Sequence, residues 1–337
     1  MENTHFLPPH YRPKLDLYHT QLAIKQAKDD FEDELAALLH LSRVSAPLFV
    51  DKATGLNDDL NGVERPVEFD IKEQPGIAVQ VVQSLAKWKR YALGRYGYPV
   101  GQGLYTDMNA IRRDEITDNF HSIYVDQWDW EKVIRREDRN PEFLKDTVRS
   151  IHRALYNTLQ KLRASFPEIE VELPEEVAFI DTTELEARYP DLSPAAREEA
   201  FVREHGAAFF LGIGWPLKSG LPHDGRAPDY DDWSLNGDLV YYHKALDTRL
   251  EISSMGIRVD AESMLAQLSA AGQMERASLP FHSALIDGRL PLTIGGGIGQ
   301  SRLCMLLLGK AHIGEVQCAL WPADVVERFS VAGVPLL

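Results

Sequence analysis

Cysteine is scarce in this chain. Only two occur among 337 residues, Cys304 and Cys318, and both stand in apolar sequence without the spacing of a metal-binding motif. We therefore expect no cysteine metal centre. We expect instead free thiols in the core of a protein kept in a reducing cytoplasm.

Long apolar runs and an excess of positive charge are also absent. The longest apolar stretches are far too short to span a bilayer, and Met1–His5 has neither the basic start nor the apolar stretch of a signal peptide. Lysine and arginine total 36 against 51 aspartate and glutamate, for a formal net charge of −15. This sign disfavours non-specific binding to nucleic acid or anionic membranes. We expect a cytoplasmic protein with neither as a partner, although local basic patches are compatible with the total.

The composition is that of a globular protein with a sizeable core. Hydrophobic residues make up 44% of the chain and charged residues 26%, both ordinary values. The length exceeds that of most single domains, but no repeat, low-complexity tract or linker divides the chain. We therefore expect one large domain.

Several segments carry apolar residues at helical spacing. The strongest begins at Pro141 and presents a continuous stripe that ends at Leu162. Another runs from Pro194 to His205, with Ser193 as its cap and Gly206 at its end. Further helices are expected over 21–41, over 86–96 and after Asp260.

Alternating and β-branched segments predict strands between these helices. They are expected over residues 44–50, 67–71, 77–82, 104–111, 121–130, 207–213, 239–243 and 249–253. Pro47 stands inside the first, which we therefore expect at an edge or interface, because proline cannot donate to a central ladder. Long strands with interspersed helices indicate an α+β fold with a largely antiparallel sheet flanked by helices.

A glycine-rich segment near the end of the chain runs from Thr293 to Arg302 and continues into an apolar stretch. Glycines at this density let a backbone pass close to a ligand, and the following helix offers free N–H groups to an anion. The segment lacks the third glycine of the dinucleotide fingerprint and the Lys-Ser/Thr ending of a P-loop. It favours a guanidinium that faces a nucleotide, and the alternative is a glycine-rich turn before a core helix.

The segment His121–Trp130 combines polar and aromatic residues with period two. On a strand, Trp128 and Trp130 would point to one face and Gln127 and Asp129 to the other. An amide and a carboxylate presented together suit a ligand with an ammonium group. The alternative is a half-buried strand whose polar face meets water.

Charged segments stand before and after this strand. Arg226–Trp233 packs three carboxylates and an arginine into a turn-like stretch, which is either a cation site or a solvated acidic loop. Asp238 and Glu251 fall on neighbouring predicted strands and could hold Mg²⁺ beside a phosphate chain, unless they form an ordinary cross-strand arrangement. Ser84–Arg90 is basic and Arg112 follows a strand, but neither is informative alone.

Five segments taken together resemble the ammonia-dependent asparagine synthetases. This family is related to the class II aminoacyl-tRNA synthetase core, and most closely to the aspartyl and asparaginyl enzymes. The matching segments, in order, are 84–90, 124–130, 226–233, 253–260 and 293–303. The resemblance runs from Pro47 to the C-terminus and implies a class II synthetase-like core, so that residues 1–337 form a single catalytic domain.

The resemblance also implies roles for single residues. Asp58, within Asn57–Gly62, resembles the carboxylate that receives ammonia. Arg112 resembles the arginine that meets the α-phosphate, and Arg302 the arginine at the ATP. Asp238 and Glu251 resemble the carboxylates for Mg²⁺ and nucleotide. Residues expected around the amino acid are Ser84, Lys89, Gln127, Asp129, Asp231, Ser254 and Arg258. Residues expected at the nucleotide are Arg112, Asp238, Glu251, Gly297, Gly299 and Arg302.

The implied reaction joins ammonia to aspartate. ATP would convert the β-carboxylate, a poor acyl donor, into a β-aspartyl-adenylate with release of pyrophosphate, while Mg²⁺ and arginines counter the charge. Ammonia would then displace AMP to give asparagine, with a nearby acid to accept a proton or orient the amine. Pro47 resembles the class II interface proline, which implies a homodimer.

Three departures from the family pattern leave alternatives open. Gln83 stands where relatives usually have histidine, and Arg113 where they have proline. The connection from Trp233 to Asp238 is short, which puts lid closure in doubt and allows a paralogue that activates aspartate for another small amine. A sensor without catalysis on the same fold is a further alternative. A tRNA-charging enzyme is disfavoured, because the chain has no room for an anticodon module and is acidic.

Overall fold

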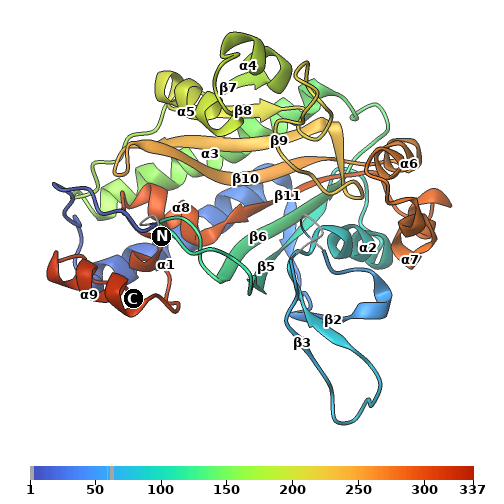
Figure 1. Cartoon of the computed structure of the whole chain (residues 1–337), viewed down its shortest axis with the longest axis horizontal. Helices are drawn as coiled ribbons and strands as arrows, with labels where there is room; N and C mark the ends of the chain where they lie inside the picture. The colour runs from blue at the N-terminus through green and yellow to red at the C-terminus, as the bar shows by residue number, and fades with distance from the viewer. Residues whose placement is uncertain (1–3, 59, 61–63) are drawn as a thin grey trace.

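A computed structural model describes residues 4–58, 60 and 64–337. Its main feature is an eight-stranded sheet with the order β1-β5-β6-β11-β10-β9-β8-β7 (Figure 1). The strands are β1 (Leu41–Arg43), β5 (Gly103–Ile111), β6 (Tyr124–Val133), β7 (Ala178–Asp181), β8 (Ala207–Leu211), β9 (Asp231–His243), β10 (Thr248–Arg258) and β11 (Thr293–Gly299). Only the outer pairs β1–β5 and β7–β8 are parallel. The expected α+β fold with a largely antiparallel sheet is confirmed.

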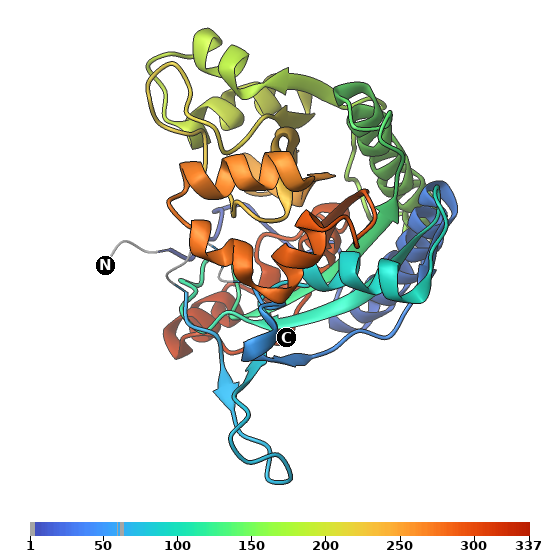
Figure 2. The ribbon, with the colours of Figure 1, turned by 90° about the vertical axis from the view of Figure 1, so that its right-hand side faces the viewer.

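A second, three-stranded sheet consists of β2 (Phe49–Asp51), β4 (Val79–Val81) and β3 (Glu68–Phe69), in that order. It projects from the lower end of the molecule (Figure 2). The strands expected over 67–71 and 77–82 are confirmed in shortened form. The strand expected over 44–50 is wrong in most of its length, because β1 ends at Arg43 and Pro47 lies in the connection to β2. Proline has no N–H to donate, which suits a connection between two sheets.

The helices are α1 (Leu17–Leu39), α2 (Ala86–Tyr96), α3 (Pro141–Ser165), α4 (Thr182–Arg188), α5 (Pro194–His205), α6 (Ala261–Ala270), α7 (Pro280–Ile286), α8 (Gln300–Leu307) and α9 (Ala323–Val331). The five expected helices are confirmed, and α2 and α5 have the expected bounds. α1 begins four residues earlier than expected, since the Asp16 side chain accepts from the backbone N–H of His19. Within the described part of the chain, no helix is long and apolar enough to cross a membrane.

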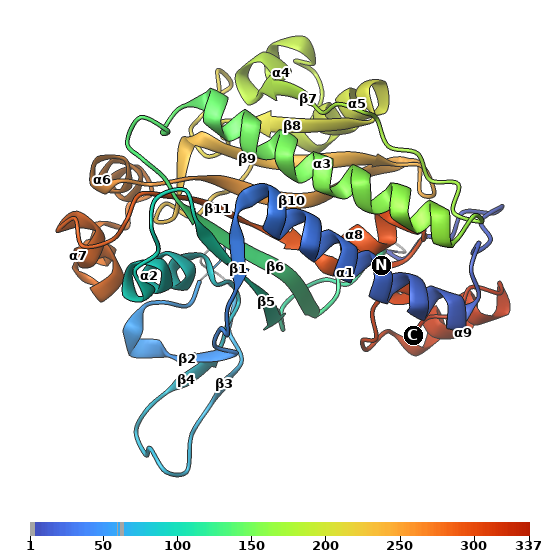
Figure 3. The same cartoon turned by 180° about the vertical axis from the view of Figure 1, so that it is seen from behind.

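One face of the large sheet is covered by α1 and α3, which run side by side across it (Figure 3). Trp128 and Trp130 of β6 are fully buried there, and the ring of Trp128 lies 4.8 Å from that of Phe31 on α1. The stripe expected on α3, from Phe143 to Leu162, packs into the same core. Burial of this apolar surface supplies most of the favourable free energy of folding.

The opposite face is covered only at its two ends. Phe209 of β8 joins the core under α3, while its neighbour Phe210 points the other way into a cluster with Phe201 of α5. At the other end, Leu93 of α2 packs on Leu104 of β5. The middle of this face, formed by β6, β11 and β10, is thereby left open between two sets of helices.

Strand β9 differs from its sequence-based expectation. It begins at Asp231, eight residues earlier than expected, and runs without a break through Trp233 to Asp238. The polar residues of this stretch suggested a turn, but Asn236 and Gly237 pair with Gly256 and Met255 of β10. The short connection from Trp233 to Asp238 is therefore strand rather than loop, and it cannot act as a lid.

The buried histidines predict how stability depends on pH. Burial lowers the pKa of His243 to about 4 and that of His312 to about 3, the latter with help from His5. Below pH 6.5 the unfolded chain binds protons that the folded chain does not, so stability present above pH 6.5 is lost as the pH falls. We expect the free energy of unfolding to drop between pH 6.5 and 4. Each of the two histidines contributes a loss of at most about 1.4 kcal/mol for each pH unit.

Urea unfolding at several pH values measures this loss. His243→Gln keeps a donor for the Lys310 carbonyl, which accepts from Nε2 at 2.8 Å, but it cannot titrate. We expect a shallower loss for this variant than for the unaltered protein. His10→Gln changes an exposed histidine and is the matched control. Parallel pH curves for His243→Gln and the unaltered protein would contradict the prediction.

Candidate active site

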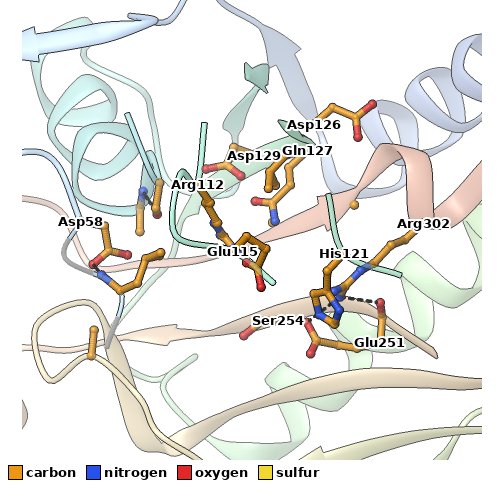
Figure 4. A pocket seen from close by; sticks show the side chains of 18 of the residues that line it. Asp58, Arg112, Glu115, His121, Asp126, Gln127, Asp129, Glu251, Ser254 and Arg302 are labelled. Carbon is orange, nitrogen blue, oxygen red and sulfur yellow. Dashed lines mark hydrogen bonds and ion pairs between the residues drawn. The ribbon is translucent and has the colours of Figure 1, made fainter. Parts of the chain in front are cut away.

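A cavity of about 460 Å³ lies over the open middle of the sheet (Figure 4). Its floor comes from β6, β10 and β11, and its walls come from the segments 112–122 and 224–231, the start of α2 and the chain around Asp58. Of the residues implicated by the sequence, it is lined by Asp58, Ser84, Lys89, Arg112, Gln127, Asp129, Asp231, Glu251, Ser254, Arg258, Gly297, Gly299 and Arg302. Asp238 is the exception: it does not line the cavity, and its carboxylate accepts from Arg226, which does.

Strand β6 supplies three polar side chains to the cavity face. Gln127 and Asp129 face the cavity while Trp128 and Trp130 fill the core, as period two predicts. Glu131 continues the same row and is fully buried, and it was not among the residues predicted for the site. The period-two pattern alone would have found it.

The glycines of β11 make room for that row. A Cβ at Gly295 would stand 2.0 Å from Glu131 Oε2, and one at Gly297 would stand 2.5 Å from Gln127 Oε1. The turn expected in this segment is wrong, because Thr293–Gly299 is a regular strand between β6 and β10. Gly296, Gly297 and Gly299 nevertheless line the cavity. The glycines admit neighbouring side chains where a side chain of their own would collide.

One end of the cavity combines a buried lysine with a buried carboxylate. Lys89 Nζ lies 3.2 Å from Asp129 Oδ2 and donates to the Gly296 carbonyl at 2.8 Å. Burial lowers the pKa of Lys89, and Asp129 opposes this shift. The other oxygen of Asp129, Oδ1, is buried and accepts no hydrogen bond from the described residues. It can accept one from a ligand ammonium group.

Next to this pair, Arg258 lies between two acidic side chains. Its Nη2 donates to Glu131 Oε2 at 2.8 Å, and its Nη1 donates to Asp231. Thr293 also donates to Glu131, at 2.7 Å. Burial raises the pKa of Asp231, against the effect of Arg258. Two carboxylates thus hold the Arg258 guanidinium in place beside the cavity. Its Cζ lies 5.8 Å from the centre of the Tyr230 ring.

The other end of the cavity carries Arg302 and Glu251. Arg302 Nη1 lies 3.6 Å from Glu251 Oε1 and donates to the Glu251 carbonyl at 3.2 Å. Figure 4 shows His121 beside this pair. Glu251 and Ser254 are three residues apart, so on a regular strand they would face opposite sides. The register of β10 shifts between Glu251 and Ser253, and this bulge brings both to the cavity.

The expected metal carboxylates are neighbours on adjacent strands. Asp238 pairs with Ser254, so it faces the same side of the sheet. Its Oδ2 accepts from Arg226, while its buried Oδ1 has no partner among the described residues. Burial raises the pKa of Asp238, and Arg226 opposes this shift. Across residues 4–58, 60 and 64–337 no group of three or more acidic, histidine or cysteine side chains is arranged to hold a metal ion.

This arrangement fits a magnesium ion that arrives with phosphates. Mg²⁺ binds through one or two carboxylates and takes its other ligands from phosphate oxygens and water. The unpartnered Oδ1 of Asp238 and the carboxylate of Glu251 are the available oxygens. A site complete in the protein alone would need more ligands than these residues supply.

Three further expected residues lie on the walls. Arg112 follows β5, and its backbone N–H donates to the Ile123 carbonyl at 2.9 Å. Ser84 Oγ accepts from the Ala86 N–H at 3.1 Å at the start of α2. Asp58 Oδ1 accepts from the Leu60 N–H at 3.2 Å. Asp59, Asn61 and Gly62 of the same motif lie outside the described residues.

The two single-residue departures have different structural meanings. Gln83 is buried, its Nε2 donates to the Asp58 carbonyl at 3.0 Å, and its backbone N–H donates to Asn57 Oδ1 at 2.8 Å. It therefore holds the Asp58 segment against α2. Arg113 is exposed and does not line the cavity.

Several residues at the cavity were not predicted from the sequence. They are His121, Asp126, Arg226 and Tyr230, together with Glu131 beneath its floor. His121 and Asp126 belonged to a segment already singled out, and Arg226 and Tyr230 to another. Their roles depend on contacts with distant elements, such as Arg226 with Asp238, that no local pattern reports.

Comparisons with known proteins agree with this geometry. A family model described as aspartate-ammonia ligase matches residues 18–333. An aspartate–ammonia ligase of Clostridium perfringens is 58% identical over 332 residues, which are 98% of this chain and 99% of the relative. The enzyme of that name from Lactobacillus johnsonii is 56% identical over 335 residues, 99% of this chain and 100% of the relative.

A solved structure supports the fold. Asparaginyl-tRNA synthetase from Pyrococcus horikoshii, complexed with asparaginyl-adenylate, matches with a TM-score of 0.64 at 16% identity. The match covers 94% of this chain and 75% of that chain. The class II synthetase fold expected from the sequence is confirmed, and the chain belongs to the aspartate–ammonia ligase family.

Proposed function

We propose that this enzyme forms asparagine from aspartate, ATP and ammonia through a β-aspartyl-adenylate, with release of pyrophosphate and AMP. The observation that best supports this proposal is a single cavity on one sheet whose two ends differ chemically. One end presents Gln127, Asp129 and Arg258, and the other presents Arg302 and Glu251. We further propose that residues 1–337 act as a single catalytic domain.

The first end is suited to aspartate. Asp129 Oδ1 and the Gln127 amide can accept hydrogen bonds from the α-ammonium group. Lys89 and Arg258 place positive charge close to the substrate carboxylates, although each already neutralises a buried acid. Ser84, Asp231 and Ser254 complete this part of the lining. Opposed charges held at fixed positions select an amino acid with a second carboxylate.

The second end is suited to ATP. Arg112 is assigned to the α-phosphate, and its Nε is buried without a partner among the described residues. Arg302, with Gly297 and Gly299 on the floor, is assigned to the nucleotide. Asp238 and Glu251 would hold Mg²⁺, which when bound counters negative charge on the triphosphate. The arginines then stabilise charge on the α-phosphorus as aspartate displaces pyrophosphate.

The amine acceptor site is assigned to Asp58. Its carboxylate lies on the cavity wall and is held by Gln83 through the backbone, while Tyr230 lines the adjacent wall. A carboxylate there can take a proton from the attacking amine or orient it. Residues 231–243 form one continuous strand, so the stretch from Trp233 to Asp238 leaves no loop opening for a larger amine, and ammonia is the acceptor that we propose.

Two properties of the whole molecule are also proposed. The first is a homodimer, supported by exposed apolar side chains beside Pro47, where Leu48 is 54% and Phe49 43% exposed. Phe69 of β3 packs edge-on against Phe49 and is also exposed, which extends the apolar surface. The second is a cytoplasmic location, supported by two free cysteines, one of them exposed.

The products of the reaction test the function. We expect AMP and asparagine in equal amounts from aspartate, ATP, Mg²⁺ and ammonium. Glutamine should be a poor nitrogen donor, since burial raises the pKa of Cys304 to about 12 and Cys318 does not line the cavity. Chromatography of nucleotides and amino acids measures both. ADP as product, AMP in excess of asparagine, or glutamine outperforming ammonium would each contradict the proposal.

Glu251→Gln tests the proposed metal carboxylate. The change keeps the shape and removes the charge, so aspartate-dependent exchange of pyrophosphate into ATP should fall about 100-fold or more. The melting temperature should change little, because Glu251 faces the cavity. Glu327→Gln on α9, an exposed position, is the control. A normal exchange rate for Glu251→Gln would show that the assignment is wrong.

Gly297→Ala tests the amino-acid end. Its Cβ would stand 2.5 Å from Gln127 Oε1 and 3.0 Å from Asp129 Oδ1. Side-chain ends can move without unfolding the sheet, so we expect the KM for aspartate to rise about tenfold, the cost of a misplaced hydrogen bond. Although Gly297 also belongs to the floor assigned to the nucleotide, the KM for ATP should change less, because the added methyl group meets Gln127 and Asp129 and not Arg302. Steady-state kinetics measure both, with Gly94→Ala in α2 as control. An unchanged aspartate KM would remove Gln127 and Asp129 from the site.

A further inference from the structure

Helix α8 carries Arg302 but lacks a cap of its own. Its N-cap residue is Gly299, which has no side chain to accept from the first turn. Arg302 is the third residue of this helix, so the position of its guanidinium depends on where the helix begins. The free N–H groups of a first helical turn normally need such an acceptor.

Asp126 of β6 supplies the missing acceptor. Its Oδ1 accepts from the Ser301 backbone N–H at 3.1 Å, and its Oδ2 accepts from Ser301 Oγ at 2.8 Å. Gln317 Nε2 donates to Oδ1 at 3.1 Å and to Ser301 Oγ at 3.0 Å. Asp126, Ser301 and Gln317 are each at most 7% exposed. A buried carboxylate thus caps α8 from a neighbouring strand, where the helix dipole favours negative charge.

The charge of Asp126 is balanced from α1. Lys28 Nζ lies 3.2 Å from Asp126 Oδ2, with 29% of its side chain exposed. In Figure 4 the Asp126 carboxylate points away from the other labelled side chains, toward the helices behind the sheet. Asp126 is among the residues that line the cavity, but both of its carboxylate oxygens are engaged by Ser301, Gln317 and Lys28, so its route to the nucleotide is through α8.

We propose that Asp126 is a positioning residue for ATP, which fixes the start of α8 and through it the guanidinium of Arg302. This inference rests on the proposed role of Arg302 at the nucleotide. Arg302 is otherwise held by weak contacts, to the Phe120 carbonyl at 3.4 Å and to Glu251. Asp126, Lys28 and Gln317 connect β6, α1 and the segment after α8 to the first turn of α8, which carries Arg302.

Equilibrium binding of ATP with Mg²⁺ to the full chain, measured by calorimetry without aspartate, tests the role. Asp126→Ala removes every acceptor and should raise the Kd about tenfold, the effect of a lost cap. Asp126→Asn keeps one acceptor oxygen and should restore part of the affinity. The Kd for aspartate should change less than about twofold, well below the tenfold change expected for ATP. Lys25→Met, which removes an exposed ion pair on the same α1, is the control.

Coupling to Arg302 separates positioning from a merely structural role. If Asp126 acts through Arg302, then Asp126→Asn should no longer weaken ATP binding in an Arg302→Met background. Additive losses, or equal losses of ATP and aspartate affinity, would overturn the positioning role. An Arg302→Met variant that binds ATP normally would instead overturn the assignment of Arg302 within the proposed function. The two failures are therefore distinguishable.

Discussion

The site depends on the neutralisation of Arg258 between Glu131 and Asp231. Side chains of Arg258 and Glu131 are 3% and 0% exposed, so neither charge could be buried without the other. Removing one member of such a pair commonly costs about 3–5 kcal/mol, because the remaining charge stays buried and unpaired. The ion pair also requires space, which Gly295 provides by lacking a Cβ beside Glu131. The buried charge of Glu131 on β6 and the glycine at position 295 on β11 therefore depend on each other.

Strand β10 links the two ends of the cavity. It carries Arg258 at the amino-acid end and Glu251 at the nucleotide end, with Ser254 between them. Without the bulge after Glu251, the side chains of Glu251 and Ser254 would point to opposite faces of the sheet, and one of them would face the core. Reaction of a carboxylate with a nucleotide needs both substrates at fixed separation, and a paired central strand maintains that separation better than a loop does.

Local patterns predicted much of this molecule. Pro141, the cap Ser193 and the glycine at 206 mark helix ends that the structure confirms, because capping is chemistry of adjacent residues. Period two placed Gln127 and Asp129 together for the same reason. Patterns failed where partners are remote. Arg226–Trp233 suggested a turn, yet the strand begins at Asp231, because Arg258 and the β10 backbone compensate the polarity of this stretch. The glycines of β11 also suggested a turn, because the side chains that fill the space beside them come from β6.

By itself, the sequence determined the α+β class, the five helices that it predicted, the placement of Gln127 and Asp129 on one face of β6 and, through resemblance, the family. Only the tertiary structure decided which charges meet. It placed Glu131 against Arg258, Arg226 against Asp238, and Asp126 at the start of α8, which are contacts across 127, 12 and 175 positions of sequence respectively. The physical reason is that an ion pair or a remote helix cap depends on distance in space, which residue spacing along the chain does not encode. Hydrophobic periodicity and capping depend on neighbours, and the sequence records those directly.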